Sequence, residues 1–131
     1  MTTAEFESLF SSICIKYGVK VFFNDITWKD NGYAIENEVH LSKKYSCLSI
    51  YKAVAFHELG HAIVNIKNGK GVKLYSIHSD FNNEFYAWWL AQRLHMKYIG
   101  RPFNKKMGNF VISCLKTHSK SHYAFKDISN A

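Results

Sequence analysis

Two histidines and a glutamate in the segment His57-Glu58-Leu59-Gly60-His61 have the types and the spacing to perform chemistry. On an α-helix, residues four positions apart lie about 40° apart around the axis and about 6 Å along it, so His57 and His61 could reach one tetrahedral Zn²⁺ ion. Glu58 lies about 100° round from His57, where its carboxylate could act as a general base towards water. This HExxH segment therefore predicts zinc-dependent hydrolysis.

The residues around this segment predict that it lies on a buried helix. A long apolar run precedes it, and apolar residues continue after it, with no proline before Pro102. Asn68-Gly69 then supplies the turn residues that typically follow a last helical turn. In the simpler alternative, His57 and His61 are ordinary histidines beside an ion-pairing glutamate. The helical setting favours a metal site.

A catalytic zinc site needs a third protein ligand and leaves a position open for water. Glu84 is the favoured ligand, because on the next predicted helix it shares a stripe with Ala87, Ala91 and Leu94. The small residues would let the two helices approach closely, and a divalent cation would offset the cost of burying the acid. Alternatively, Glu84 is a solvated residue of a first helical turn, where the helix dipole favours acids. The other downstream candidates are Asp80, Asp127, His78, His95, His118 and His122.

The HExxH segment and the later pattern E-x-x-A-x-x-L-A-x-x-L, which begins at Glu84, together resemble the ImmA/IrrE-type metallopeptidases, a gluzincin-like family. The resemblance covers roughly residues 33–96. It implies a minimal zincin-like fold, with Zn²⁺ held by His57, His61 and Glu84 and with Glu58 as the catalytic base. It also implies a selective protease that cleaves a specific intracellular protein such as a repressor. Proteases of this family are often encoded on phages or other mobile elements.

The chain departs from that family pattern at three points. Leu90 stands where an aromatic residue is usual, His95 replaces a second leucine, and no proline closes the helix. A second zincin type, the SprT-like proteases that act on DNA-associated proteins, takes a later histidine as third ligand. His78 stands 17 residues after His61 and could play that part, although the chain has no CxxC pair for the zinc ribbon that often accompanies such proteases.

The periodicity of the chain predicts one α+β domain over residues 1–131. An N-terminal helix begins at a capping box formed by Thr2 and Glu5 and ends at Gly18. A small sheet that includes antiparallel pairing follows, from the runs 19–23 and 33–41. The HExxH helix, the ligand helix and a supporting C-terminal helix over 107–118 complete the domain, with a flexible tail expected from about residue 119.

Two further sets of residues are candidates for substrate binding and catalysis. In zincins a strand before the active helix pairs with extended substrate, and Val39, His40 and Leu41 occupy that place in the sequence. An electrophile could also stabilise the oxyanion of the tetrahedral intermediate. The candidates for that role, each with a plain surface residue as the alternative, are Tyr75, His78, His122 and Tyr123.

The composition limits the cellular compartment and the binding partners that we expect for the chain. The three cysteines have no CxxC spacing, and neither an export signal nor a membrane-spanning run is recognisable, so we expect a cytoplasmic protein without a membrane partner. The net charge is +7, but 15 of the 17 basic residues are lysine and no nucleic-acid-binding motif occurs. Weak nucleic-acid contact is the most that this surface predicts. A non-catalytic zincin-fold binding module with a basic face is the alternative to a protease.

Overall fold

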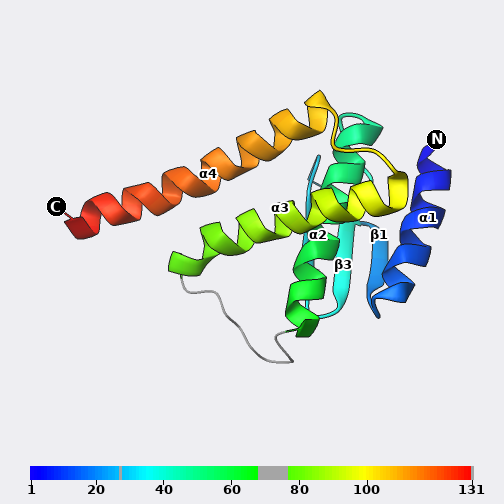
Figure 1. The fold of residues 1–131 in the computed structure, drawn as a ribbon, viewed down its shortest axis with the longest axis horizontal. Coiled ribbons are helices and arrows are strands. Elements are labelled where there is room, and N and C mark those ends of the chain that lie inside the picture. The colour runs from blue at the N-terminus through cyan, green and yellow to red at the C-terminus, as the bar shows by residue number, and fades with distance from the viewer. Residues whose placement is uncertain (27, 68–76, 131) are drawn as a thin grey trace.

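The fold was analysed in a computed structural model that describes the backbone of residues 1–26, 28–67 and 77–130, and the side chains except those of residues 24–27, 68–82 and 118–131. It is an α+β structure with four helices and a three-stranded sheet in the described part of the chain. Figure 1 shows the elements in chain order: α1 (Thr3–Lys16), β1 (Lys20–Ile26), β2 (Gly32–Ile35), β3 (Glu38–Ser42), α2 (Leu48–Lys67), α3 (Ile77–Ile99) and α4 (Lys105–Asn130).

The N-terminal helix has the capping predicted from the sequence. The Thr2 side chain accepts a hydrogen bond from the Glu5 backbone amide, and the Glu5 carboxylate accepts one from the Thr2 amide. The chain leaves α1 through Gly18, whose φ of 70° lies in the left-handed region that glycine adopts without steric cost. The capping box and the glycine therefore set the two ends of α1, as predicted.

The sheet is mixed, with strand order β1-β3-β2. β2 and β3 form the hairpin expected from residues 33–41 and pair antiparallel, whereas β1 pairs with β3 in parallel. The turn of the hairpin contains Glu36, which has a φ of 51°, and the Glu36 carbonyl accepts a hydrogen bond from the side-chain amide of Asn65 in α2. The hairpin is thus attached to the helix that carries the HExxH segment.

The prediction that Val39, His40 and Leu41 pair with a substrate strand is wrong. These residues belong to β3, which is the middle strand, and both of its edges are hydrogen-bonded to neighbouring strands. Val39 and Leu41 are fully buried beneath α2, so neither their backbones nor their side chains are open to a peptide. The sequence gives the strand but not its position in the sheet, which here depends on the parallel pairing with the distant β1.

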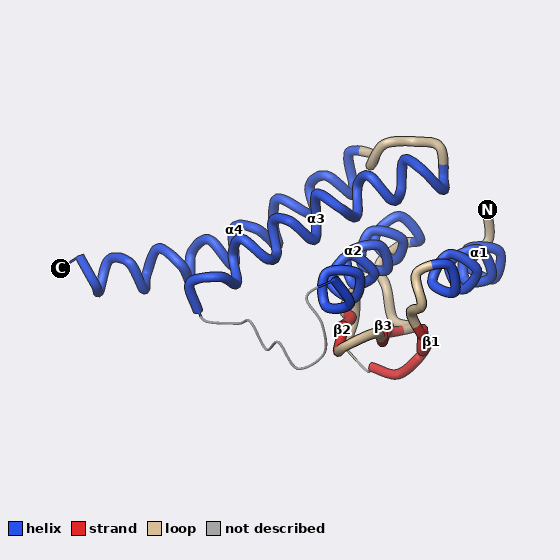
Figure 2. The backbone as a smooth tube through the Cα atoms, turned by 60° about the horizontal axis from the view of Figure 1, so that its bottom comes forward, coloured by secondary structure: helices blue, strands red, loops and turns tan. Residues whose placement is uncertain are grey.

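The helices pack on one side of the sheet, and α2 lies at the centre of the core. Figure 2 shows α1 and α2 above the strands and the pair α3 and α4 beyond α2. Aromatic rings join α1 to α2, since Phe56 lies 6.1 Å from Phe6 and 5.5 Å from Phe10 between ring centroids. Because its neighbours surround it, α2 is buried along most of its length, as its apolar sequence predicts.

The last two helices form an antiparallel pair that crosses α2, as Figure 1 shows. His95 of α3 is buried and donates a hydrogen bond of 2.7 Å from Nδ1 to the carbonyl of Arg101 in the connecting loop. Burial lowers the pKa of His95, and Lys52 lowers it further, although the bond to Arg101 acts in the opposite direction. His95 therefore ties α3 to the loop that leads into α4.

The backbone of α4 continues as a helix to Asn130, so residues 119–130 are helical where the sequence predicted a tail. The sequence did not predict this part of the helix, because the apolar repeat ends near residue 118 and the segment that follows is polar. Within the part of the chain that the structure describes, no helix is both long enough and apolar enough to cross a membrane.

Candidate metal centre

The middle of α2 brings together the side chains of the HExxH segment. His57 and Glu58 are buried, His61 is half-buried, and ligand atoms of the three lie within 4.8 Å of one another. The two imidazole rings meet edge to face, with centroids 4.6 Å apart, as expected for positions one turn apart on a helix. Such a cluster of nitrogen and oxygen donors is able to hold a divalent cation.

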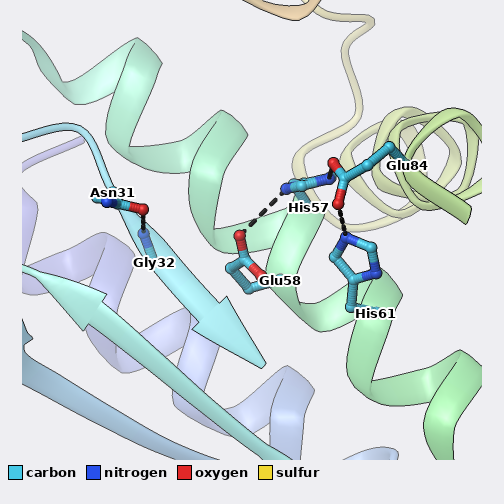
Figure 3. A network of polar contacts seen from close by, with 6 residues as sticks. All are labelled: Asn31, Gly32, His57, Glu58, His61 and Glu84. Carbon is cyan, nitrogen blue, oxygen red and sulfur yellow. Dashed lines mark hydrogen bonds and ion pairs between the residues drawn. The ribbon is translucent and has the colours of Figure 1, made fainter. Parts of the chain in front are cut away.

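Glu84 of α3 reaches both histidines. Its Oε1 lies 2.7 Å from Nε2 of His61, and its Oε2 lies 2.8 Å from Nε2 of His57. Figure 3 shows the Glu84 carboxylate between the two rings, on the opposite side of His57 from Glu58. Glu84 is therefore not a solvated residue of a first helical turn, because its carboxylate is engaged by both imidazoles.

The nitrogens of His57 have different surroundings. Nδ1 lies 3.1 Å from Oε2 of Glu58, a contact in which a protonated Nδ1 donates to the carboxylate. Nε2 is buried and lies beside Glu84, but no hydrogen bond with acceptable geometry forms at this atom within the described residues. A proton on Nδ1 leaves a lone pair on Nε2, and a lone pair that faces a carboxylate is stabilised by a cation placed between them. The donor set thus fits a divalent metal.

The electrostatics of the cluster follow from this arrangement. Burial lowers the pKa of His57, but the contacts with the Glu58 and Glu84 carboxylates and their negative charges outweigh it and raise the pKa to about 9, so a cation that binds Nε2 must displace a proton from it. Burial raises the pKa of Glu84, whereas His57 and His61 together hold it well below its usual range. Cys114 of α4 behaves differently, because burial, followed by Glu84 and Glu58, raises the pKa of its thiol to about 11. Negative charge is therefore concentrated in the carboxylates.

The close approach of α2 and α3 places Glu84 within reach of the histidines. A Cβ atom at Gly60 would lie 2.9 Å from the carbonyl oxygen of Ala87, so only glycine allows this separation. Ala87 and Ala91 are fully buried on the facing side of α3. The two alanines were expected to permit the approach, whereas Gly60, inside the HExxH segment, was not singled out by the sequence analysis.

The β2 strand borders the cluster on the side of Glu58. A Cβ atom at Gly32 would lie 3.0 Å from Cγ of Glu58 and 3.0 Å from the carbonyl oxygen of His40. The Gly32 amide donates a 2.7 Å hydrogen bond to the Asn31 side chain, as Figure 3 shows. Gly32 therefore makes room for the Glu58 side chain beside the sheet. The sequence carried a signal for this only as the turn dipeptide Asn31-Gly32.

A second unexpected neighbour is Trp88 of α3. Its indole is stacked on the His57 ring, with centroids 3.9 Å apart and 12° between the planes. The residue is almost completely buried. A tryptophan four positions after the predicted ligand is a recognisable signal in retrospect, because residues at this spacing share a helix face.

The other sequence candidates lie in less well described parts of the chain. Tyr75 falls outside the described residues. The backbones of His78, His122 and Tyr123 belong to α3 and α4, but their side chains fall outside the described set. His78 as third ligand and the four oxyanion candidates therefore stay predictions, whereas Glu84 contacts both histidines.

Comparison of the chain with models of known protein families, with curated proteins and with solved structures gives no significant match.

Proposed function

We propose that the chain is a zinc-dependent peptidase of minimal zincin-like architecture. The observation that carries the proposal is the convergence of Nε2 of His57, Nε2 of His61 and the carboxylate of Glu84, from two helices, with Glu58 beside them. These three residues would hold the metal. A zinc ion bound there would supply a Lewis acid that polarises the scissile carbonyl and acidifies water.

The chain's own residues supply the proton transfers. Glu58 is buried next to the cluster and does not share the Nε2 side of His57, so it is free to act as general base. It takes a proton from the attacking water and passes it to the amine that leaves when the peptide bond breaks. Gly32 leaves room for this side chain, and Glu58 also orients His57 through Nδ1.

The strand that receives substrate is β2 in this proposal. It is an edge strand of the sheet, it lies next to Glu58, and its outer backbone groups are not paired with another strand in the described residues. A peptide added along this edge would gain main-chain hydrogen bonds and would pass close to the cluster. Such pairing makes little demand on the side chains of the substrate, so the β2 edge would supply affinity and not selectivity.

Kinship with the ImmA/IrrE-type peptidases is part of the proposal and supports a selective protease acting on an intracellular protein such as a repressor. The third ligand favours this type over the SprT-like one, because Glu84 contacts both histidines. All three cysteines are free thiols, which supports a reducing compartment such as the cytoplasm.

The substitution Glu58→Gln tests the proposal. The variant should keep about one zinc per chain and lose cleavage by a factor of about 10²–10⁴, because it keeps the shape of the side chain but cannot accept a proton. Purified protein is incubated with a proteome-derived peptide library, new termini are identified by mass spectrometry, and zinc is measured by elemental analysis. Glu38→Gln, on a half-buried acid of β3 that pairs with His40, is the matched control and should cleave like the wild type.

Two outcomes would contradict the peptidase. Equal cleavage by the wild type and Glu58→Gln would remove the general base from the mechanism. A wild type that binds zinc and cleaves nothing in the library would favour the non-catalytic binding module instead.

A further inference from the structure

Trp88 covers one face of the His57 ring, and the proposed chemistry gives it no part. The centroids are 3.9 Å apart and the planes 12° apart, so the indole and the imidazole are stacked. Trp88 is 2% exposed and lies four residues after Glu84 on α3. One face of α3 therefore supplies both the carboxylate at Nε2 of His57 and the aromatic surface over the same ring.

The two carboxylates and the indole restrict different motions of the His57 ring. Glu58 at Nδ1 and Glu84 at Nε2 lie at opposite edges of the ring, at 3.1 Å and 2.8 Å. Two such contacts fix the direction of the nitrogens but leave the ring free to tilt about the line that joins them. The stacked indole removes this freedom, because a tilt of the imidazole would bring its atoms into the Trp88 ring. Trp88 thus sets the plane in which the Nε2 lone pair lies.

The indole also has an electronic preference. Its π-face attracts positive charge more strongly than the face of any other aromatic side chain. An imidazole that donates its Nε2 lone pair to a cation becomes electron-poor, so its stack on Trp88 is strengthened in that state. We propose that Trp88 is a positioning residue that orients His57 for a divalent cation and stabilises the cation-bound imidazole. This inference rests on the proposed function.

The N–H group of the Trp88 indole finds no partner among the described residues, which indicates that the face of the ring, and not its polar group, is what matters to His57. Nε1 of Trp88 is buried and has no hydrogen-bond partner among the described residues. An unpaired buried donor costs free energy that a phenyl ring would avoid, so polar recognition does not account for tryptophan here. The edge of Phe110 from α4 meets the indole at 6.0 Å and 77°, which holds it in place. The α4 helix therefore supports His57 through Trp88.

The experiment uses a full-length chain in which Trp88 is the sole tryptophan. Trp28→Phe and Trp89→Phe give this background, and both replaced residues are exposed. Trp88 is then labelled with 5-fluoro-, 5,7-difluoro- and trifluorotryptophan, which weaken the π-face stepwise while nearly preserving its shape. The dissociation constant of Co²⁺ is measured by its visible absorption and that of Zn²⁺ by competition with a chelator. Trp88→Phe and Trp88→Leu are measured in the same way.

Trp88→Leu should weaken metal binding by about tenfold and Trp88→Phe by less, in line with a desolvated cation–π contact. The affinities for Co²⁺ and Zn²⁺ should both fall at each step of fluorination. A purely structural role would alter none of these in the fluorinated series, so equal affinities across the series would overturn the inference, even if Trp88→Leu failed to fold. Failure of the wild type, as well as the background protein, to bind metal would instead overturn the proposed function.

Discussion

At the residue scale, Glu84 is the side chain on which the proposed metal centre depends. The two histidines share one helix, so their proximity follows from local geometry alone. Glu84 comes from another helix and still lies within 2.8 Å of both Nε2 atoms. An acid placed so far along the chain reaches this position only through the tertiary packing of α3 on α2.

Replacement of Glu84 by alanine should weaken zinc binding by more than about 100-fold. Even the loss of a residue that only hydrogen-bonds to a metal ligand typically lowers metal affinity by about 10- to 100-fold. His78→Ala is the matched comparison, because it removes the rival third ligand from the first turn of the same helix. It should retain zinc at close to wild-type affinity. Chelator competition on the two purified variants measures both. A His78→Ala protein that loses zinc while Glu84→Ala retains it would reverse the ligand assignment.

The residues brought together at the site were predictable where chemistry fixes their spacing. The HExxH segment required both histidines on one helix face, and the apolar stripe of α3 indicated that Glu84 points inward. Gly32 and Trp88 were not predictable in this way. Each owes its role to a neighbour distant in sequence, Glu58 in one case and His57 in the other, so the turn dipeptide at Gly32 and the helical spacing of Trp88 from Glu84 did not by themselves reveal that role.

At the scale of elements, the separation of α2 and α3 decides whether Glu84 reaches the histidines. Gly60 lies against the Ala87 carbonyl, and a Cβ atom there would be 2.9 Å from that oxygen. The backbone at Ala87 cannot swing aside as a side chain would. A larger residue at position 60 therefore has to move one helix relative to the other.

Gly60→Ala should destabilise the fold by up to about 2 kcal/mol, because an overpacking cost of about 1–3 kcal/mol is only partly offset by the gain of nearly 1 kcal/mol in helix propensity. It should also weaken zinc binding, since Glu84 moves with α3. Gly108→Ala in α4 is the control, because nothing lies within 4 Å of its Cβ position. That variant should instead gain up to about 1 kcal/mol. Urea unfolding of the metal-free proteins gives both values, and a Gly60→Ala protein as stable as Gly108→Ala would refute the close approach.

The order of the strands in the sheet could be predicted from the sequence only in part. The β2–β3 hairpin is local, so the sequence of the run 33–41 was enough to predict antiparallel pairing there. The parallel pairing of β1 with β3 is not local and places β3 in the middle of the sheet. The edge strand was for this reason misassigned to Val39, His40 and Leu41, although the segment itself was correctly predicted to be a strand.

At the scale of the whole molecule, zinc should act on stability as a ligand of the folded state. At a free concentration about 1,000 times its dissociation constant, zinc should stabilise the fold by about 4 kcal/mol, which corresponds to about 10–20 °C in Tm for a chain of this size. A chelator should reverse the shift, and His57→Ala should abolish it. Differential scanning fluorimetry at several zinc concentrations measures the effect. A Tm that does not respond to zinc would contradict binding to the native fold.

The charge of the molecule leads to a separate expectation. Net charge of +7 and a predominance of lysine favour weak contact with phosphate rather than base recognition, and this stays a prediction. The packing of α1, α2 and the sheet was more accessible to sequence analysis than this surface. Apolar periodicity determines the buried faces, whereas solvated lysines on different elements leave no periodic signature.

The division of the proposed ligands between two helices has one more consequence. Glu84 stands 23 residues after His61, so an ion coordinated by both would close a loop of the backbone, much as a covalent crosslink does. Docking of α3 onto α2 would then be coupled to the supply of free divalent ions. The proposed metal centre would then be held together most firmly where such ions are plentiful.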